Sequence, residues 1–245
     1  RGEREAPTCT DCHGEHSISA IHAPESKVSA SNISDTCSQC HAAERITTKY
    51  RLPSYVVTTY MESIHGLTAQ LGSVKVANCS SCHGVHDILP STDPLSPIHP
   101  DNLPKTCGKC HDNPEFTKKH LYSIKTPGIM YSNSVHGKIV ANGNNAATCI
   151  TCHGKHDIKN RIQSGSKISS INIPSTCARC HEEITEEYQQ SIHWIAVKKG
   201  IRESPSCNDC HSEHSIHAIN TLDKREEIKN IQAKTCLQCH QNILL

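Results

Sequence analysis

The motif Cys-x-x-Cys-His constrains the fold of this 245-residue chain more than any other sequence feature, because it occurs eight times. The first copy lies in the stretch TCTDCHGEH, residues 8–16. Together the copies use all sixteen cysteines, so none is left for another role. The eight copies are Cys9/Cys12/His13, Cys37/Cys40/His41, Cys79/Cys82/His83, Cys107/Cys110/His111, Cys149/Cys152/His153, Cys177/Cys180/His181, Cys207/Cys210/His211 and Cys236/Cys239/His240.

Disulfide bonding, zinc binding and thioredoxin-like chemistry do not account for the motif. A disulfide framework gives no reason for a histidine at a fixed offset. Paired Cys-x-x-Cys zinc sites need no adjacent histidine, and thioredoxin-like redox chemistry needs one motif, not eight. Cys-x-x-Cys-His is instead typical of covalent c-type haem attachment.

Haem attachment gives each residue of the motif a role. The two thiols bond to two vinyl groups of one haem, and the adjacent histidine lies beneath the iron as its proximal ligand. We therefore predict eight haems c per chain, attached through all sixteen cysteines. The predicted proximal ligands are His13, His41, His83, His111, His153, His181, His211 and His240.

The composition is poor in the side chains that fill an ordinary core. Aromatic residues are 3% of the chain, and the 35% hydrophobic residues include the sixteen cysteines. We expect the haems to form the core and the chain without haem to be unfolded, as in small metal-dependent domains. The predicted fold class is mostly irregular with short α-helices, a haem-cored repeat protein with little or no β-sheet.

The motifs are arranged as four repeats of two. Cys9, Cys79 and Cys149 are spaced by 70 residues, and Cys207 follows after 58. In each repeat the second motif begins 28 or 29 residues after the first. We predict a single domain over residues 1–245, made of two-haem repeats at approximately 1–60, 61–130, 131–188 and 189–245.

Regular structure outside the motifs is expected to be sparse. Residues 182–197 are predicted to form one helix, because acidic residues lie near the start of that segment. Shorter helices are predicted at residues 42–50 and 223–233. Five prolines within residues 89–104 predict an extended linker.

Eleven histidines outside the attachment motifs are candidates for the distal ligands. A histidine three residues after the proximal one lies on the wrong side of its own haem, so we expect it to bind a neighbouring iron. A Ser-x-His element before three of the repeats supplies three more candidates. The predicted distal ligands are His16, His86, His156 and His214 from the first motifs, and His65, His136 and His193 from the Ser-x-His elements.

One distal ligand is missing from this pattern, because the first repeat has no Ser-x-His element. Either a histidine outside the pattern supplies it within the chain, or another subunit donates it. The candidates for this eighth distal ligand are His22, His99, His120 and His217. With only two methionines, His/Met ligation is possible at two haems at most, so mostly bis-histidine, low-potential haems are expected.

Charge and hydropathy restrict the location and the partners. The formal charge is +1, and haem propionates would make the holoprotein acidic. The sequence has no basic run of the kind that binds nucleic acid, and no apolar run long enough for a transmembrane segment. Arg1 resembles the start of a processed chain, and prokaryotic c-type haem attachment takes place outside the cytoplasm. We expect an extracellular or cell-surface protein, or alternatively a periplasmic one.

The elements S-x-H-G, C-x-x-C-H-G-x-H and T-C-x-x-C-H, in this order, resemble those of multihaem c-type cytochromes from anaerobic and metal-reducing microbes. The resemblance covers nearly the whole chain. It implies haems packed in alternating parallel-stacked and T-shaped pairs that carry electrons. Some members of that group polymerise into extracellular filaments, in which a histidine of one subunit caps a haem of the next.

We therefore expect electron transfer along a closely packed chain of haems, in a subunit of an extracellular conductive filament. The expected partners are further copies of the chain, joined head to tail, and redox donor and acceptor proteins or extracellular minerals. A soluble periplasmic shuttle is one alternative. A multihaem oxyanion reductase is another, but no Cys-x-x-Cys-Lys marks an open iron, and we expect no enzyme activity.

Overall fold

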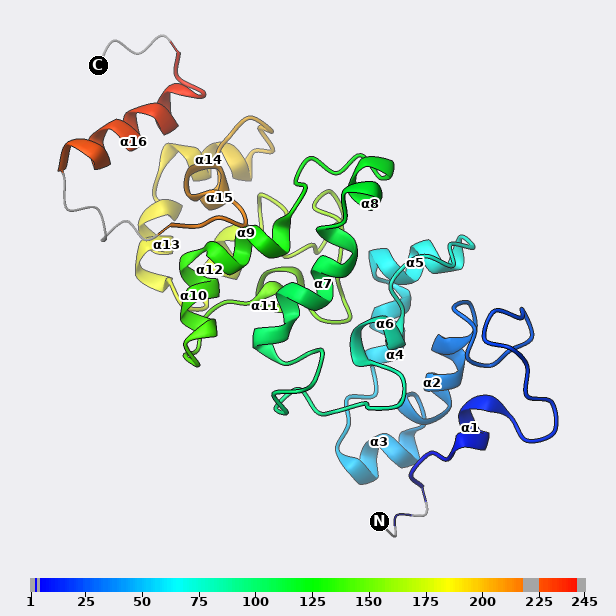
Figure 1. The fold of residues 1–245 in the computed structure, drawn as a ribbon. Coiled ribbons are helices and arrows are strands. Elements are labelled where there is room, and N and C mark those ends of the chain that lie inside the picture. Colours follow the sequence, from blue (N-terminus) through cyan, green and yellow to red (C-terminus); the bar gives the residue numbers. More distant parts are fainter. Residues whose placement is uncertain (1–2, 4, 218–224, 242–245) are drawn as a thin grey trace. The chain divides into compact units, whose positions relative to one another are not determined.

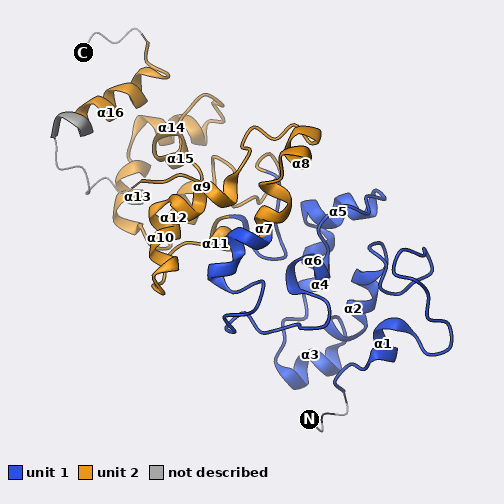
Figure 2. Cartoon of the chain, in the orientation of Figure 1, with its two compact units in different colours: residues 1–106, 153–160 blue, residues 107–152, 161–245 orange. Residues whose placement is uncertain are grey.

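The computed structural model describes residues 3, 5–217 and 225–241. Within these ranges the chain forms sixteen α-helices and one 3₁₀ helix, and no strand (Figure 1). The prediction of short helices joined by irregular segments is therefore confirmed. The chain divides into two compact units, residues 1–106 with 153–160 and residues 107–152 with 161–245 (Figure 2). The boundaries of the four sequence repeats remain a prediction.

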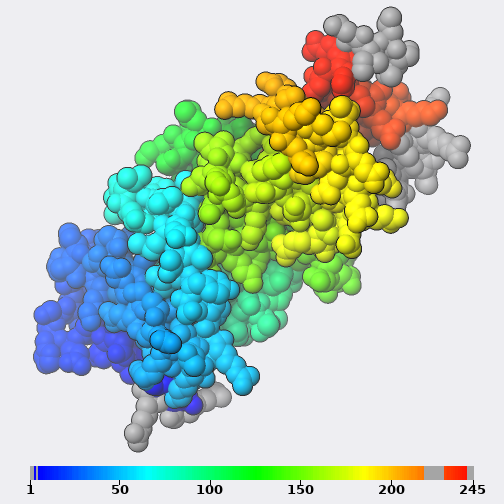
Figure 3. All heavy atoms as spheres, turned by 180° about the vertical axis from the view of Figure 1, so that it is seen from behind, coloured from blue at the N-terminus to red at the C-terminus, as the bar shows by residue number. Residues whose placement is uncertain are grey.

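Unit 1 is built around α2, which packs against α1, α3, α4 and α6. In the space-filling view, the blue N-terminal segment and the cyan segment of α4 to α6 adjoin (Figure 3). The helices are α1 (Cys9–His13), α2 (Ile33–His41), α3 (Glu44–Tyr50), α4 (Val56–Met61), α5 (Ile64–Gln70), α6 (Cys79–His83), η1 (Pro100–Asn102) and α7 (Leu103–His111), which continues into unit 2.

Unit 2 repeats the same helix pairs. Helix α9 packs against α10 as α4 does against α5, and α12 packs against α13 and α15. The helices are α8 (Pro114–Lys119), α9 (Pro127–Asn133), α10 (Val135–Ala141), α11 (Cys149–His153), α12 (Ile173–Ala178), α13 (Glu182–Gln189), α14 (Ile192–Lys198), α15 (Cys207–His211) and α16 (Arg225–Leu237).

The predicted helix over residues 182–197 is interrupted, because Ser191 ends one helix and starts another. Helix α13 stops at Gln189, and the Ser191 side chain caps α14 by accepting a hydrogen bond from the Trp194 backbone N–H at 3.2 Å. Serine is a favoured N-cap residue, so this serine competes with continuation of the helix. The helix predicted at 42–50 is α3. Of the helix predicted at 223–233, the described part belongs to α16, and residues 223–224 lie outside the described residues.

The expectation of an extended linker at residues 89–104 was wrong. The backbone forms successive turns with a three-residue period, for example from Ser96 N–H to Asp93 O and from His99 N–H to Ser96 O. The Asn102 side chain holds the turns together by donating to the Pro94 and Ser96 carbonyls at 2.8 and 2.9 Å. Proline is compatible with turns because it presets φ and needs no N–H donor there.

The protein has almost no apolar core of its own. Among the described residues, the buried large apolar side chains are Ile33, Ile46, Leu103, Val140 and Val197. Most other buried side chains are serines and threonines that bond to nearby backbone. None of the helices in the described part of the chain has the length and apolar composition needed to cross a bilayer.

Candidate functional site

The predicted proximal histidines of the four first motifs lie at the ends of five-residue helices that begin with the first cysteine of the motif, namely α1, α6, α11 and α15. Helix α6 has only five residues, too few to be stable alone, and Asn78 caps it with a reciprocal bond to Ser81. The chain then reverses at Gly84, whose φ of 85° is one that glycine adopts readily. This reversal carries the second histidine of the motif away from the helix.

The structure brings four proximal histidines opposite four of the predicted distal histidines. The distances between ring centroids fall between 6.0 and 6.2 Å. In every pair the two residues come from different motifs, as the sequence predicts. The pairs are His13 with His86 at 6.2 Å, His83 with His156 at 6.0 Å, His136 with His181 at 6.2 Å and His193 with His240 at 6.1 Å.

These distances fit an iron held between two imidazoles. With metal–nitrogen bonds of about 2.0 Å and each ring centre about 1.1 Å behind its nitrogen, two axial imidazoles have centroids about 6.2 Å apart. Ordinary aromatic contacts range over about 4.5–7 Å. The near-constant distance and the fixed sequence register together favour axial ligation. The described residues contain no cluster of three or more possible ligands for a bare metal ion.

The surroundings of three of the paired histidines, His83, His136 and His156, favour the neutral imidazole. Burial, with the nearby imidazoles of His156 and His41, lowers the pKa of His83. Burial and the neighbouring His181 likewise lower the pKa of His136. Because iron binds the unprotonated nitrogen, these shifts hold the side chains in the form needed for ligation.

A cap and a close backbone approach position the Ser-x-His histidines. Ser134 caps α10 by accepting from the Gly137 N–H at 3.1 Å, which starts the helix one residue before His136. A Cβ on Gly137 would collide with the Tyr131 carbonyl oxygen, so only glycine permits this approach. The Tyr131 hydroxyl donates to the Ala147 carbonyl at 2.9 Å and ties the element to the next attachment motif.

First cysteines of successive motifs lie against each other at the junctions between repeats. The Cys37 thiol donates a hydrogen bond to Cys79, which raises the pKa of Cys37 and lowers that of Cys79 to about 7. Each such contact joins the second motif of one repeat to the first motif of the next. The other contacts of this kind are Cys107 with Cys149 and Cys177 with Cys207.

Motifs within one repeat are also neighbours. Besides its dominant hydrogen bond with Cys79, Cys37 is close enough to Cys12 for that thiol to raise its pKa further. The pKa of Cys177 is raised mainly by its bond with Cys207 and by burial, and to a smaller extent by the nearby Cys152. The pKa of Cys210 is raised mainly by burial and by Asp209, and to a smaller extent by the nearby Cys236. Within each unit, therefore, the motifs follow one another in space in the order of the sequence.

The second cysteine of every motif keeps part of its surface accessible, as attachment of a haem at its sulfur requires. No disulfide links any of the sixteen cysteines, all of which lie in the described residues. The assignment of these cysteines to haem thioether bonds stays a prediction. Among the second cysteines, five are half-buried, namely Cys12, Cys40, Cys82, Cys110 and Cys152, and three are exposed, namely Cys180, Cys210 and Cys239.

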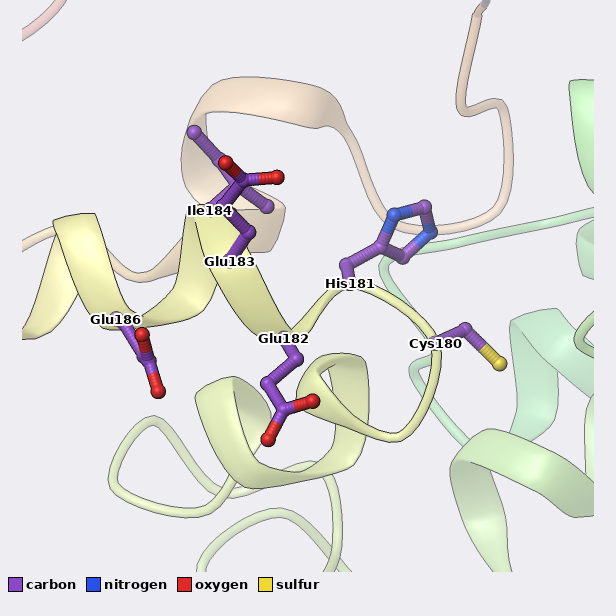
Figure 4. Close-up of a pocket in the computed structure, with 6 residues that line it drawn as sticks. All are labelled: Cys180, His181, Glu182, Glu183, Ile184 and Glu186. Carbon is purple, nitrogen blue, oxygen red and sulfur yellow. The ribbon is translucent and has the colours of Figure 1, made fainter.

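An open hollow lies beside the sixth attachment motif. Figure 4 shows the Cys180 sulfur and the His181 ring on the loop before α13, with three carboxylates projecting from the helix. Open space against both the sulfur and the imidazole fits a cofactor bonded to the chain at that cysteine. The residues lining the hollow are Cys180, His181, Glu182, Glu183, Ile184 and Glu186.

Three histidines of the pattern have no ring partner among the described residues. These are the proximal His41 and His211 and the predicted distal His16, all three of them exposed. Four other predicted ligands are half-buried: His65 in α5, His111 at the end of α7, His153 at the end of α11 and His214 after α15. Burial lowers the pKa of His111 and of His214.

None of the four candidates for the eighth distal ligand faces a proximal ring within the described part of the chain. His22 and His217 are exposed. His99 accepts a hydrogen bond from the Asp101 N–H at 3.4 Å at the start of η1. His120 packs against Phe116, with ring centroids 4.5 Å apart. Their assignment stays a prediction.

A backbone contact between repeats was not predicted from the sequence. The Ile64 N–H, in one Ser-x-His element, donates to the Ile158 carbonyl at 2.8 Å, and the Val135 N–H donates to the Ile216 carbonyl at 2.8 Å. The acceptor lies two residues after the second histidine of a first motif in both cases. The sequence does contain a feature that could have indicated this contact, because an isoleucine occupies the acceptor position in all four first motifs.

Comparison with known proteins gives one family. The family described as outer membrane cytochrome MtrC/MtrF-like, domains II/IV, matches residues 5–193, which is well over half of the chain. No curated protein and no solved structure matches the chain.

Proposed function

This chain belongs to the outer membrane cytochrome MtrC/MtrF-like family and is a multihaem c-type cytochrome that transfers electrons, and on this premise we propose how it does so. Eight haems c form a continuous path along the chain, each bonded through two cysteines. Histidines hold their irons from both faces. The observation that carries this proposal is the constant separation of 6.0–6.2 Å in four proximal–distal histidine pairs.

The order of the motifs in space supports a path that follows the sequence. The thiols of Cys37 and Cys79 are in contact, so the haems attached there would have adjacent edges. The same holds for Cys107 with Cys149 and for Cys177 with Cys207. The haem supplies the one-electron chemistry, whereas the chain fixes the spacing, the ligands and the local charge.

Ligation from both faces favours an electron carrier over a reductase. An iron between His83 and His156 has no position left for a substrate, and the same is true of the other three pairs. The lowered pKa of His83 keeps the ring in its ligating form. We therefore propose that the chain has no catalytic activity of its own.

The family description and the sequence together favour a location at the cell surface or outside the cell. We propose that the chain is a subunit of a conductive filament there, which passes electrons to external acceptors. A soluble periplasmic shuttle with the same haem array is the alternative that the experiment below separates from the filament.

The test combines haem counting with spin-state measurement on the purified holoprotein. Mass spectrometry of the denatured chain should show eight covalent haems, and the EPR spectrum of the oxidised protein should be dominated by low-spin ferric haem. Electron microscopy of the same sample separates filament from shuttle. A dominant high-spin signal would contradict the proposal and favour a multihaem oxyanion reductase instead.

A further inference from the structure

The fourth attachment motif differs from the second motifs of the other repeats at two positions four residues apart. The residue after its first cysteine is Gly108, and the residue after its proximal histidine is Asp112. Residues four apart in a helical turn lie on the same face and can touch. The equivalent pairs in the other repeats are Ser38 with Ala42, Ala178 with Glu182 and Leu237 with Gln241, so none of them combines a glycine with an acid.

The Asp112 carboxylate lies against the backbone of Gly108, between the two cysteines of the motif. A Cβ on Gly108 would come within 2.5 Å of Asp112 Oδ2, so any larger residue at this position must displace the carboxylate. The Asp112 N–H donates to the Gly108 carbonyl at 3.0 Å, which keeps the two residues in one helical turn. The carboxylate is therefore held over the segment whose two thiols are predicted to attach the fourth haem.

A hydrogen bond from the next helix fixes the other carboxylate oxygen. The Gly128 N–H, in the first turn of α9, donates to Asp112 Oδ1 at 2.8 Å. The side chain of Thr126, the N-cap residue of α9, makes no cap bond, so Asp112 supplies the acceptor instead. Asp112 is half-buried and forms no ion pair with a lysine or arginine in the described part of the chain. Its negative charge is therefore fixed in place without a contacting cation.

The charge of Asp112 acts on the two thiols that meet where the fourth motif adjoins the fifth. The pKa of Cys107 is raised mainly by its hydrogen bond with Cys149 and by burial, and Asp112 raises it further. The bond with Cys107 lowers the pKa of Cys149, and the negative charge of Asp112 opposes that shift. One carboxylate thus lies close to the attachment points of two successive haems.

We propose that Asp112 lowers the reduction potentials of the fourth and fifth haems, and that Gly108 makes room for the carboxylate to do so. A fixed negative charge stabilises a ferric haem over a ferrous one, because the iron loses one positive charge when it gains an electron from its neighbour. An electron on the path is therefore less stable at this junction than it would be without Asp112. The proposal rests on the haem ligation and the path proposed above.

The first experiment is a redox titration of the Asp112→Asn holoprotein followed by EPR. Asparagine keeps an oxygen for the Gly128 N–H but removes the charge, so the ferrous-to-ferric ratio of two of the haems should rise at a fixed potential, about tenfold for the more affected one. Glu115→Gln, which removes an exposed carboxylate three residues on, is the control and should shift no haem comparably. Unshifted potentials in Asp112→Asn would show that Asp112 only caps α9 and would overturn the proposal.

The second experiment displaces the carboxylate without removing it. Gly108→Ala should shift the same two haems in the same direction but less, and adding it to Asp112→Asn should give no further shift. A Gly108→Ala shift of equal size in the absence of the carboxylate would contradict the proposed role of the glycine. Haem counting and the low-spin EPR signal separate the outcomes, because unshifted potentials with eight low-spin haems refute this inference alone, whereas missing haems refute the proposed function.

Discussion

His156 and His16 occupy equivalent positions in almost the same local sequence, CHGKHDI and CHGEHSI, yet their surroundings differ. His156 is half-buried with its ring 6.0 Å from that of His83, whereas the His16 side chain is 94% exposed. The local sequence therefore presents the histidine, and the neighbouring repeat decides whether it has a partner. This dependence on nearest neighbours is the behaviour of a repeat protein.

The largest expected effect comes from preventing haem attachment. With five large apolar side chains buried in the described residues, the chain has too little core to offset its conformational entropy. Expression without the haem-attachment machinery should give an unfolded chain in which His156 and His16 are equally exposed. Circular dichroism and hydrogen exchange measure this, and a protected, helical apoprotein would show that the repeats fold without their cofactor.

The next largest effect is expected from removing His156, which is proposed to bind the iron held by His83. His156→Ala should convert the haem held by His83 from low-spin to high-spin and leave the haem held by His153 unchanged. The reason is that the His156 ring faces His83 and not the helix of its own motif. A structure of the variant identifies the altered iron, and a change at His153 instead would disprove the register.

A smaller effect is expected from substituting the residue that follows the histidine of a Ser-x-His element, because this residue differs between the elements. Gly137 allows α10 to approach the Tyr131 carbonyl, while the third element has Trp194 at this position. Gly137→Ala should lower the free energy of unfolding by about 1–3 kcal/mol and loosen His136 from His181. Denaturant unfolding and the spin state measure both effects. Lys138→Ala, an exposed change one residue on, is the control and should leave both unchanged.

The smallest predicted effect concerns the turn after the proximal histidine. Gly84 adopts φ 85° there, but the fourth repeat places Ser212 at φ 70° and ψ 170°, a conformation that costs a non-glycine residue about 1–3 kcal/mol. Ser212→Gly should therefore raise the stability of the fourth repeat by about 1 kcal/mol, after the entropy lost by the added glycine. Thermal unfolding measures the gain, and Ser215→Gly, three residues on, should give none.

Much of the site was predictable because covalent chemistry fixes residue types and spacing. The eight attachment motifs determine where the thiols and proximal imidazoles lie along the chain. The offset between His153 and His156 alone indicates that the second histidine serves another haem. The absence of strands in the described residues also followed from the sequence, since a chain with so few apolar residues offers no face for a sheet to pack on.

Features that depend on competition between local bonds were not predicted. The helix over residues 182–197 is interrupted because the Ser191 hydroxyl caps a new helix, a choice that hydrophobic pattern does not reveal. The proline-rich linker forms turns because Asn102 supplies two side-chain hydrogen bonds across it. Such bonds are worth about 1 kcal/mol each, enough to decide between alternatives that are close in energy.

The sequence by itself determined the cofactor class and predicts the attachment residues, because both depend on chemistry within a few residues. Only the tertiary structure decided which histidine meets which, because a partner 45 to 73 residues away is chosen by packing and not by local sequence. The Ile64–Ile158 backbone bond and the His83–His156 pair are products of that packing. It also distinguished the exposed His16 from the half-buried His156 and His214, since exposure depends on the neighbouring repeat and not on the residue.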